Sequence, residues 1–155
     1  MGIKSFQGRR TATLVKENEP ILVSDYMTKK LITFKADQPI EDVIDTLIAN
    51  KISGGPVVNE QNELIGIISE GDCMKQISDS RYYNLPIDKR NTVEKAMVKE
   101  VETINGNMNI FDLANKFLQS KRRRFPIVEN GKLIGQISQK DVLKAALKLR
   151  GSTWK

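Results

Sequence analysis

The sequence contains no histidine and a single cysteine, Cys73, among its 155 residues. Histidine is the commonest metal ligand and the usual general base near neutral pH, so its absence argues against zinc sites, hydrolytic triads and histidine-based acid–base chemistry. A single cysteine cannot form an internal disulfide bond. We therefore expect a protein that is not an enzyme and that requires no metal or other cofactor.

Long hydrophobic segments are also missing, and aromatic residues make up only 6% of the chain. No apolar run approaches the roughly 18 residues that a membrane-spanning helix needs, and the N-terminus lacks the apolar core of a secretory signal. We therefore expect a cytoplasmic protein with no membrane association. Hydrophobic residues still make up 39% of the sequence, which is enough for one compact domain or for two small halves that share a core.

The chain contains an internal repeat. Residues 27–58 align with residues 97–128 at a constant offset, so that Thr33 aligns with Thr103, and the offset shortens by one residue in the next loop. The sequence is therefore predicted to be a tandem duplication. Its expected parts are a basic N-terminal arm at 1–20, repeat 1 at 21–79, a connector at 80–91, repeat 2 at 92–150 and a C-terminal tail at 151–155.

Each repeat is predicted to begin with a strand and a helix. Strands rich in β-branched residues are expected at 31–34 and 101–104. Helices are expected next, because apolar residues recur there at positions i, i+3, i+4, i+7 and i+8. These residues are Ile40, Val43, Ile44, Leu47 and Ile48 in repeat 1, and Ile110, Leu113, Ala114, Phe117 and Leu118 in repeat 2. Pro39 stands near the start of the first helix, and Asn109 with Asp112 is expected to cap the second.

A hairpin and a final helix are predicted to complete each repeat. The expected hairpin strands are 56–58 with 64–68, and 126–128 with 133–137. Asn130-Gly131 between the second pair of strands is a strong turn signal. The final helix of repeat 2 is expected to end at Gly151 and to bury one face. That face consists of Val142, Leu143, Ala146, Leu147 and Leu149. The fold class is therefore α/β (α+β), with two β-α-β-β-α repeats expected to pack about a pseudo-twofold axis because each is too small to fold alone.

Each final helix starts at a Ser-x-x-Asp motif, with Ser69 and Asp72 in repeat 1 and Ser138 and Asp141 in repeat 2. The usual role of this motif is a capping box, in which the hydroxyl and the carboxylate bind free backbone amides. A helix start can also receive an anion such as phosphate, and a neighbouring carboxylate suits the hydroxyls of a ribose. Because the same corner occurs twice in matching surroundings, we favour the ligand-binding interpretation.

With these motifs in order, the repeat resembles the CBS domain, the cystathionine-β-synthase-type unit that occurs in pairs called Bateman modules. The resemblance covers residues 21–149 and rests above all on the two Gly-x-h-Ser-x-x-Asp endings. Its other marks are Met27 and Met97, Pro56-Val57-Val58 and Pro126-Ile127-Val128. Such pairs bind adenosine-containing ligands in two clefts, most often AMP, ADP, ATP or S-adenosylmethionine, and regulate a partner domain or protein. They also commonly dimerise, so the resemblance implies a homodimer and a regulated protein of unknown identity.

The resemblance also implies roles for individual residues. Asp72 and Asp141 match the acid that binds ribose, and the serines of the same two motifs match a hydroxyl near the phosphate. Thr33 and Thr103 match a residue that lines the base pocket, although their β-propensity alone explains threonine in a strand. The ligand expected from these positions is an adenine nucleotide that acts as a regulator.

The two repeats differ just before the proline that opens each hairpin. Repeat 1 has Ser53-Gly54-Gly55 there, whereas repeat 2 has the basic run from Lys121 to Arg124. The regulatory subunit of AMP-activated kinase, a member of the same family, has basic residues that contact phosphate at this place, and Arg123 and Arg124 occupy the matching positions. Guanidinium groups bind phosphate oxygens in a bidentate manner. The second cleft is therefore expected to bind an adenine nucleotide more tightly than the first.

The net charge of +6 is compatible with any anionic partner. A run of four cations is usually a solvated face or a patch for nucleic acid. Two alternatives to a nucleotide sensor therefore stay open: a nucleic-acid-binding accessory protein that uses Lys121 to Arg124, and a ligand-free dimerisation scaffold. No helix-turn-helix, zinc knuckle or stacking-aromatic motif is present, so we expect nucleic acid not to be the main partner.

Overall fold

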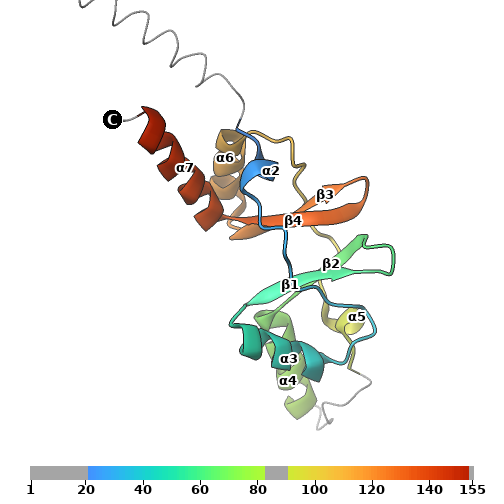
Figure 1. Ribbon diagram of the computed structural model, residues 1–155. Helices are drawn as coiled ribbons and strands as arrows, with labels where there is room; N and C mark the ends of the chain where they lie inside the picture. The colour runs from blue at the N-terminus through green and yellow to red at the C-terminus, as the bar shows by residue number, and fades with distance from the viewer. Residues whose placement is uncertain (1–20, 83–90, 154–155) are drawn as a thin grey trace, which may run out of the picture. The chain divides into compact units, whose positions relative to one another are not determined.

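The computed structural model describes residues 21–82 and 91–153, and Figure 1 shows their helices and strands. The predicted N-terminal arm lies outside these described residues, as do most of the predicted connector and the last two residues of the tail. The described chain forms two compact units. Unit 1 contains residues 21–28, 105–125 and 136–153, and unit 2 contains residues 29–82, 91–104 and 126–135.

Unit 2 is built on an antiparallel hairpin of β1 (Gly54–Val58) and β2 (Leu64–Ser69). The helix α3 (Ile40–Asn50) packs beside α4 (Glu70–Tyr82), and α4 also contacts β2 and α5 (Val93–Ala96) (Figure 1). The predicted hairpin is confirmed. Because β2 runs directly into α4, the helix start is fixed at the end of the sheet.

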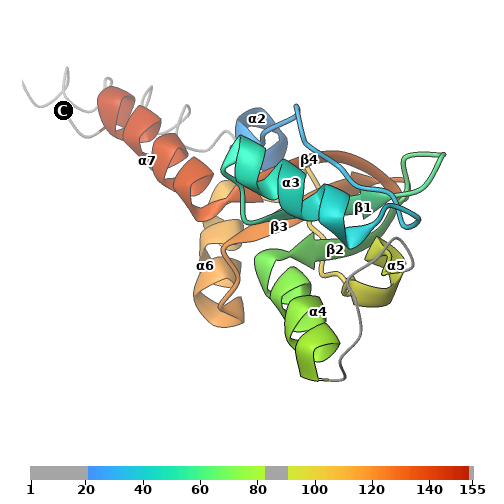
Figure 2. The ribbon, with the colours of Figure 1, turned by 90° about the horizontal axis from the view of Figure 1, so that it is seen from below.

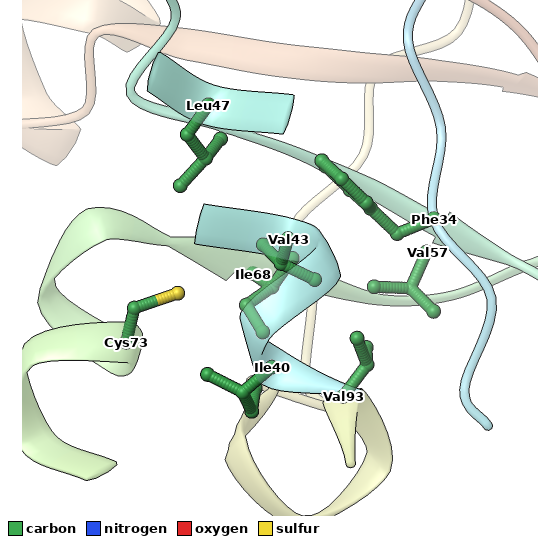
Figure 3. Packing of buried hydrophobic residues seen from close by; sticks show 8 residues of the cluster. All are labelled: Phe34, Ile40, Val43, Leu47, Val57, Ile68, Cys73 and Val93. Carbon is green, nitrogen blue, oxygen red and sulfur yellow. The ribbon is translucent and has the colours of Figure 1, made fainter. Parts of the chain in front are cut away.

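A single apolar cluster joins these elements of unit 2. Figure 3 shows its buried members, which are Phe34, Ile40, Val43, Leu47, Val57, Ile68, Cys73 and Val93. Fully burying one such aliphatic or aromatic side chain contributes about 1.5–3 kcal/mol. The predicted helix face is confirmed at its first, second and fourth positions, whereas Ile48 is 72% exposed. The helix therefore presents one large apolar side chain to solvent.

The strands expected at 31–34 and 101–104 are wrong as extended strands. Phe34 forms an isolated parallel bridge with Val57, and Ile104 forms the equivalent bridge with Ile127. Two backbone hydrogen bonds of 2.9 Å hold Phe34 to β1. The residues just before each bridge are exposed, so only the one buried side chain of each segment is anchored to a hairpin.

Unit 1 contains α2 (Val23–Tyr26), α6 (Ile110–Ser120) and α7 (Gln139–Thr153), and α7 contacts both of the others. The second hairpin consists of β3 (Arg124–Glu129) and β4 (Lys132–Ser138). Its two ends belong to unit 1 and its tip belongs to unit 2.

The turn and the cap predicted for repeat 2 are both confirmed. Asn130 and Gly131 have positive φ angles of 53° and 80°, as the tight turn of a two-residue hairpin requires. The Asn109 side chain accepts a hydrogen bond of 2.8 Å from the amide of Phe111 and caps α6.

The prediction that Gly151 stops the last helix is wrong, because α7 continues to Thr153. The predicted buried face is also partly wrong. Leu143 and Leu147 are 65% and 63% exposed, whereas Ala145 is completely buried. The buried side of α7 therefore contains Ala145, and the two leucines are left in solvent.

The short helix at the start of each repeat packs with the longer helices of the other repeat. The amide of Val23 in α2 donates to the carbonyl of Met108 at 2.9 Å, next to the start of α6. The equivalent amide of Val93 in α5 donates to the carbonyl of Gln38 at 2.9 Å, next to the start of α3. Figures 1 and 2 show α5 beside the helices of repeat 1. The two lead-in helices are thus exchanged between the repeats.

The mixture of helices and short hairpins in two repeats confirms the predicted α/β (α+β) class. The packing about a pseudo-twofold axis stays a prediction. None of the described helices has the length and apolar character needed to cross a bilayer.

Candidate ligand-binding site

The Ser-x-x-Asp motif of repeat 1 forms a capping box at the start of α4. The backbone amide and the hydroxyl of Ser69 both donate to Oδ2 of Asp72 at 2.9 Å. The amide of Asp72 donates back to Oγ of Ser69 at 3.4 Å. Both side chains are half-buried at the junction of β2 and α4.

Ser138 and Asp141 repeat this geometry at the start of α7. The amide and hydroxyl of Ser138 donate to Oδ2 of Asp141 at 2.9 and 3.0 Å, and the amide of Asp141 donates to Oγ of Ser138 at 3.2 Å. The motif is therefore a capping box in both repeats. This role leaves room for a ligand, because each carboxylate uses only Oδ2 in these bonds and can offer Oδ1 to a hydroxyl group.

The first amide of each helix is also bonded within the protein. The amide of Glu70 donates to the carbonyl of Ser53 at 2.8 Å, and the amide of Gln139 donates to the carbonyl of Arg123 at 3.1 Å. Within the described chain, the amide of the second helical residue has no such acceptor in either repeat. A helix start normally leaves its first amides without partners in the helix. An anion would therefore meet only part of the usual set of free amides, and cationic side chains would have to supply the rest of its contacts.

The arginines of repeat 2 lie next to the start of α7. The side-chain amide of Gln139 donates to the carbonyl of Arg122 at 3.0 Å, in addition to the backbone bond to Arg123. The side chain of Arg123 is exposed, and that of Arg124 is half-buried at the first position of β3. This contact places the backbone of Arg123 next to the helix start that carries Ser138 and Asp141, and the role of its side chain stays a prediction. The sequence analysis did not single out Gln139, whose two hydrogen bonds join the start of α7 to the backbone of Arg122 and Arg123.

The corresponding backbone of repeat 1 has no room for an arginine at the position of Arg124. A Cβ atom on Gly54 would lie 2.6 Å from the carbonyl oxygen of Ile68 and 3.1 Å from Cα of Ser69. The next residue, Gly55, faces the ring of Phe34, which would lie 2.9 Å from an added Cβ. Repeat 1 therefore has no room for a cationic side chain at the position that Arg124 occupies in repeat 2.

In repeat 2 the place of Gly55 is taken by Phe125, which is completely buried. Its ring packs on that of Phe117, with a distance of 4.9 Å between the ring centroids. The two hairpins therefore begin with different core packing. The second hairpin starts with an arginine, whereas the first has no room for a side chain at the equivalent residue, Gly54.

The two threonines are exposed and precede the bridge residues Phe34 and Ile104. Thr33 belongs to the same unit as Ser69 and Asp72, and no hydrogen bond joins it to either of them among the described contacts. Thr103 belongs to unit 2, whereas Ser138 and Asp141 belong to unit 1. The base-pocket role of both threonines stays a prediction.

One thiol, that of Cys73, lies next to the start of α4. Burial, followed by the negative charges of Asp72 and Glu70, raises the pKa of the Cys73 thiol, so it stays protonated and unreactive near neutral pH. Among residues 21–82 and 91–153, no group of three or more histidine, cysteine, aspartate or glutamate side chains is placed to hold a metal ion.

Comparisons with known proteins identify the family. The sequence model of the CBS domain matches residues 23–79 and again residues 93–148. The protein MJ1225 of Methanocaldococcus jannaschii is 30% identical over 137 residues, which cover 88% of this chain but only 45% of MJ1225.

Two solved structures share the fold. Arabidopsis thaliana CBSX2 in complex with AMP has a TM-score of 0.73 and 28% identity, over 83% of this chain and 98% of that one. The CBS domain pair of MJ0100, in complex with 5′-methylthioadenosine and S-adenosyl-L-methionine, has a TM-score of 0.67 at 23% identity, over 83% and 98% of the two chains, and supports the fold alone. The chain therefore belongs to the CBS domain family and carries two copies of the domain.

Proposed function

We propose that this chain is a non-catalytic regulatory module that binds an adenine nucleotide, with AMP as the first candidate, and signals its binding state to a partner protein. The observation that carries the proposal is the likeness to CBSX2, whose structure contains AMP and matches 83% of this chain at 28% identity. The proposal includes a location in the cytoplasm.

The two helix starts described above are the proposed binding sites. A ribose hydroxyl can donate to Oδ1 of Asp141 while Oδ2 keeps its bonds to Ser138. The phosphate of the same nucleotide would then lie near the start of α7, within reach of Arg123 or Arg124. Charge-assisted hydrogen bonds of this kind contribute about 1.5–3 kcal/mol. We therefore assign the tighter site to repeat 2.

Self-association belongs to the same proposal. Ile48 on α3 and Leu118 on α6 occupy equivalent positions in the two repeats and are 72% and 82% exposed. Large exposed apolar residues grouped on helices are typical of protein–protein contact sites. We propose that the chain is a homodimer whose copies meet through these helices. Sedimentation as a monomer at micromolar concentration, with and without nucleotide, would rule this out.

The decisive experiment is isothermal titration calorimetry with AMP, ADP, ATP, S-adenosylmethionine and adenosine. We expect saturable binding of at least one nucleotide, with a tighter and a weaker event. Asp141→Ala should abolish the tighter event, and the matched variant Asp72→Ala should spare it. The proposal fails if no adenosine-containing ligand binds, and the assignment to repeat 2 fails if Asp72→Ala removes the tight event instead.

An oligonucleotide titration separates this function from the nucleic-acid alternative. Binding through Lys121 to Arg124 should weaken by close to one log unit per log unit of salt for each phosphate contacted. We expect only weak binding that does not depend on sequence. Sub-micromolar affinity for an oligonucleotide at physiological salt would favour the alternative.

A further inference from the structure

The two helix starts that are proposed to bind the nucleotide differ in charge. The first turn of α4 carries two acids, Glu70 and Asp72, whereas the first turn of α7 carries one. Gln139 stands where α4 has Glu70, and Lys140 stands where α4 has Gly71. An acid in the first turn lies near the positive end of the helix dipole and opposes the binding of an anion there. The start of α4 is therefore the poorer place for a phosphate.

The chain segment beside each helix start widens this difference. The amide of Glu70 donates to the carbonyl of Ser53 at 2.8 Å, so the segment 51–54 reaches the start of α4. This segment contains one cation, Lys51, whereas the equivalent residues 121–124 are all cationic. A lysine stands first in both segments, so it does not distinguish them. Together with the helix turn, the first site has two acids and one cation, and the second has one acid and five cations.

The negative charge at the start of α4 acts on a neighbouring group. Cys73 follows Asp72 directly, and burial, followed by the charges of Asp72 and Glu70, raises the pKa of its thiol. Both carboxylates therefore oppose the formation of a further negative charge close to them. A phosphate monoester carries about −1.5 to −2 charges near neutral pH, and it would meet the same opposition.

We propose that the first cleft selects an adenosine ligand that lacks a phosphate and is neutral or positively charged at its 5′ end, with Glu70 as the residue that excludes phosphate. S-adenosylmethionine belongs to this class, because a sulfonium group is attached at that end. The inference rests on the proposed function and specifies the ligand of its first cleft. Specificity of this kind depends on repulsion of the wrong ligand as well as on attraction of the right one. The second cleft keeps its preference for phosphate, so one chain would respond to two different adenosine compounds.

Calorimetry with three ligands of similar size tests the charge preference. At the 5′ position, 5′-amino-5′-deoxyadenosine is positively charged, adenosine is neutral and AMP is negatively charged. The ligands are titrated into the Asp141→Ala chain, in which the second cleft is disabled. We expect the affinity to fall about tenfold at each step in this order, because each step makes the interaction with the two acids less favourable. AMP binding that is as tight as adenosine binding would overturn the inference.

A matched double variant, Glu70→Gln with Gly71→Lys, gives the first turn of α4 the residues of α7. Space is available for it, since a Cβ atom on Gly71 would lie 3.7 Å from Oγ of Ser69, an ordinary contact. On the Asp141→Ala background, this exchange should strengthen AMP binding about tenfold, weaken binding of the amine and leave adenosine unchanged. Unchanged adenosine binding is the control for an intact site. Equal changes for all three ligands would overturn the role of Glu70.

Salt and a variant in repeat 2 give independent readouts. Screening by salt should bring the affinities of the two charged ligands closer to that of adenosine at the first cleft. In the parent chain, Lys140→Glu places an acid beside the second cleft and should weaken AMP binding there about tenfold while sparing adenosine. Affinities that respond to neither change would show that local charge does not set the preference, and the inference would fail.

The outcomes separate this inference from the proposed function. If the parent chain binds AMP but the Asp141→Ala chain binds none of the three ligands, the inference fails and the proposed function stands. If the Asp141→Ala chain prefers AMP, the inference fails in the same way. If the parent chain binds no adenosine-containing ligand, the proposed function fails, and the inference fails with it.

Discussion

Asp141 and Ser138 exchange three hydrogen bonds across the first turn of α7. Oδ2 of Asp141 accepts from the Ser138 amide at 2.9 Å and from its hydroxyl at 3.0 Å, and Oγ of Ser138 accepts from the Asp141 amide at 3.2 Å. The carboxylate proposed to bind ribose thus also holds the helix start in place. We therefore expect a substitution at this position to change stability and ligand affinity together, and the two effects have to be measured separately.

The stability effect should depend on whether an acceptor remains at this position. Asp141→Ala removes the acceptor and should lower the free energy of unfolding by about 1 kcal/mol. Asp141→Asn keeps an amide oxygen and should cost less than about 0.5 kcal/mol. Urea denaturation measures both values, with the exposed Lys144→Ala as control. Equal losses for alanine and asparagine would show that the capping bonds contribute little.

The arginines should act on the phosphate and not on the nucleoside. Arg123→Ala or Arg124→Ala should weaken AMP binding to the second cleft about ten- to a hundredfold, which corresponds to one charge-assisted hydrogen bond. Adenosine binding should stay the same, because it has no phosphate to contact. Calorimetry with both ligands checks this prediction, and equal weakening of adenosine would contradict it.

A gain of function in repeat 1 provides the matched control for the arginines. Ser53 aligns with Arg123, and its carbonyl makes the same bond to the first helical amide. Ser53→Arg should therefore keep the backbone and strengthen AMP binding at the first cleft. Gly54→Arg should instead destabilise the protein, because the new Cβ would clash with the carbonyl of Ile68. A stable Gly54→Arg protein would contradict the steric account.

The C-cap of α3 offers a stabilising substitution. Lys51 has a left-handed backbone with a φ of 54°, a conformation that favours glycine. Lys51→Gly should raise the free energy of unfolding by about 0.5–1 kcal/mol. The control is Lys75→Gly in the interior of α4, which should cost about 1 kcal/mol. Thermal or urea denaturation decides, and a loss of stability at both sites would contradict the role of the cap conformation.

The buried thiol should make the protein less stable at alkaline pH. Folding raises the pKa of Cys73 above 9.0, chiefly because the thiol is buried. The unfolded chain therefore loses this proton at a lower pH than the folded chain does. The resulting stabilisation is fully present below about pH 9 and is lost as the pH rises through the folded pKa. Denaturation of the parent and of Cys73→Ala between about pH 8 and pH 10 should show a smaller decline in the variant.

The periodic and local features of the fold could be predicted from the sequence. The helices containing Val43 and Leu113 show a helical apolar pattern and form where it predicts, and the Asn130-Gly131 turn and the Asn109 cap depend only on neighbouring residues. The two capping boxes are local in the same sense. Their role in ligand binding stays a prediction because it depends on a molecule that the sequence does not contain.

Features set by distant contacts could not be predicted in this way. The residues around Phe34 have strand propensity, but only one residue pairs with the hairpin, because the neighbouring positions face solvent. Gly151 ends a helix only if the backbone leaves the helical conformation there, and the chain instead continues to Thr153. The burial of Ala145 in place of the neighbouring leucines depends on how α7 packs with α2 and α6, which precede it by many residues in the sequence.

The exchange of the lead-in helices between repeats has a consequence for biosynthesis. Residues 21–28 are made before the rest of repeat 1, whereas the carbonyl of Met108 that receives the Val23 amide belongs to repeat 2 and is made after all of repeat 1. Contacts of such long sequence separation form late and slow folding. A chain cut between the repeats would give two fragments, each holding the lead-in helix that the other needs. Mixing such fragments should therefore restore the fold, because each fragment supplies the helix that the other lacks.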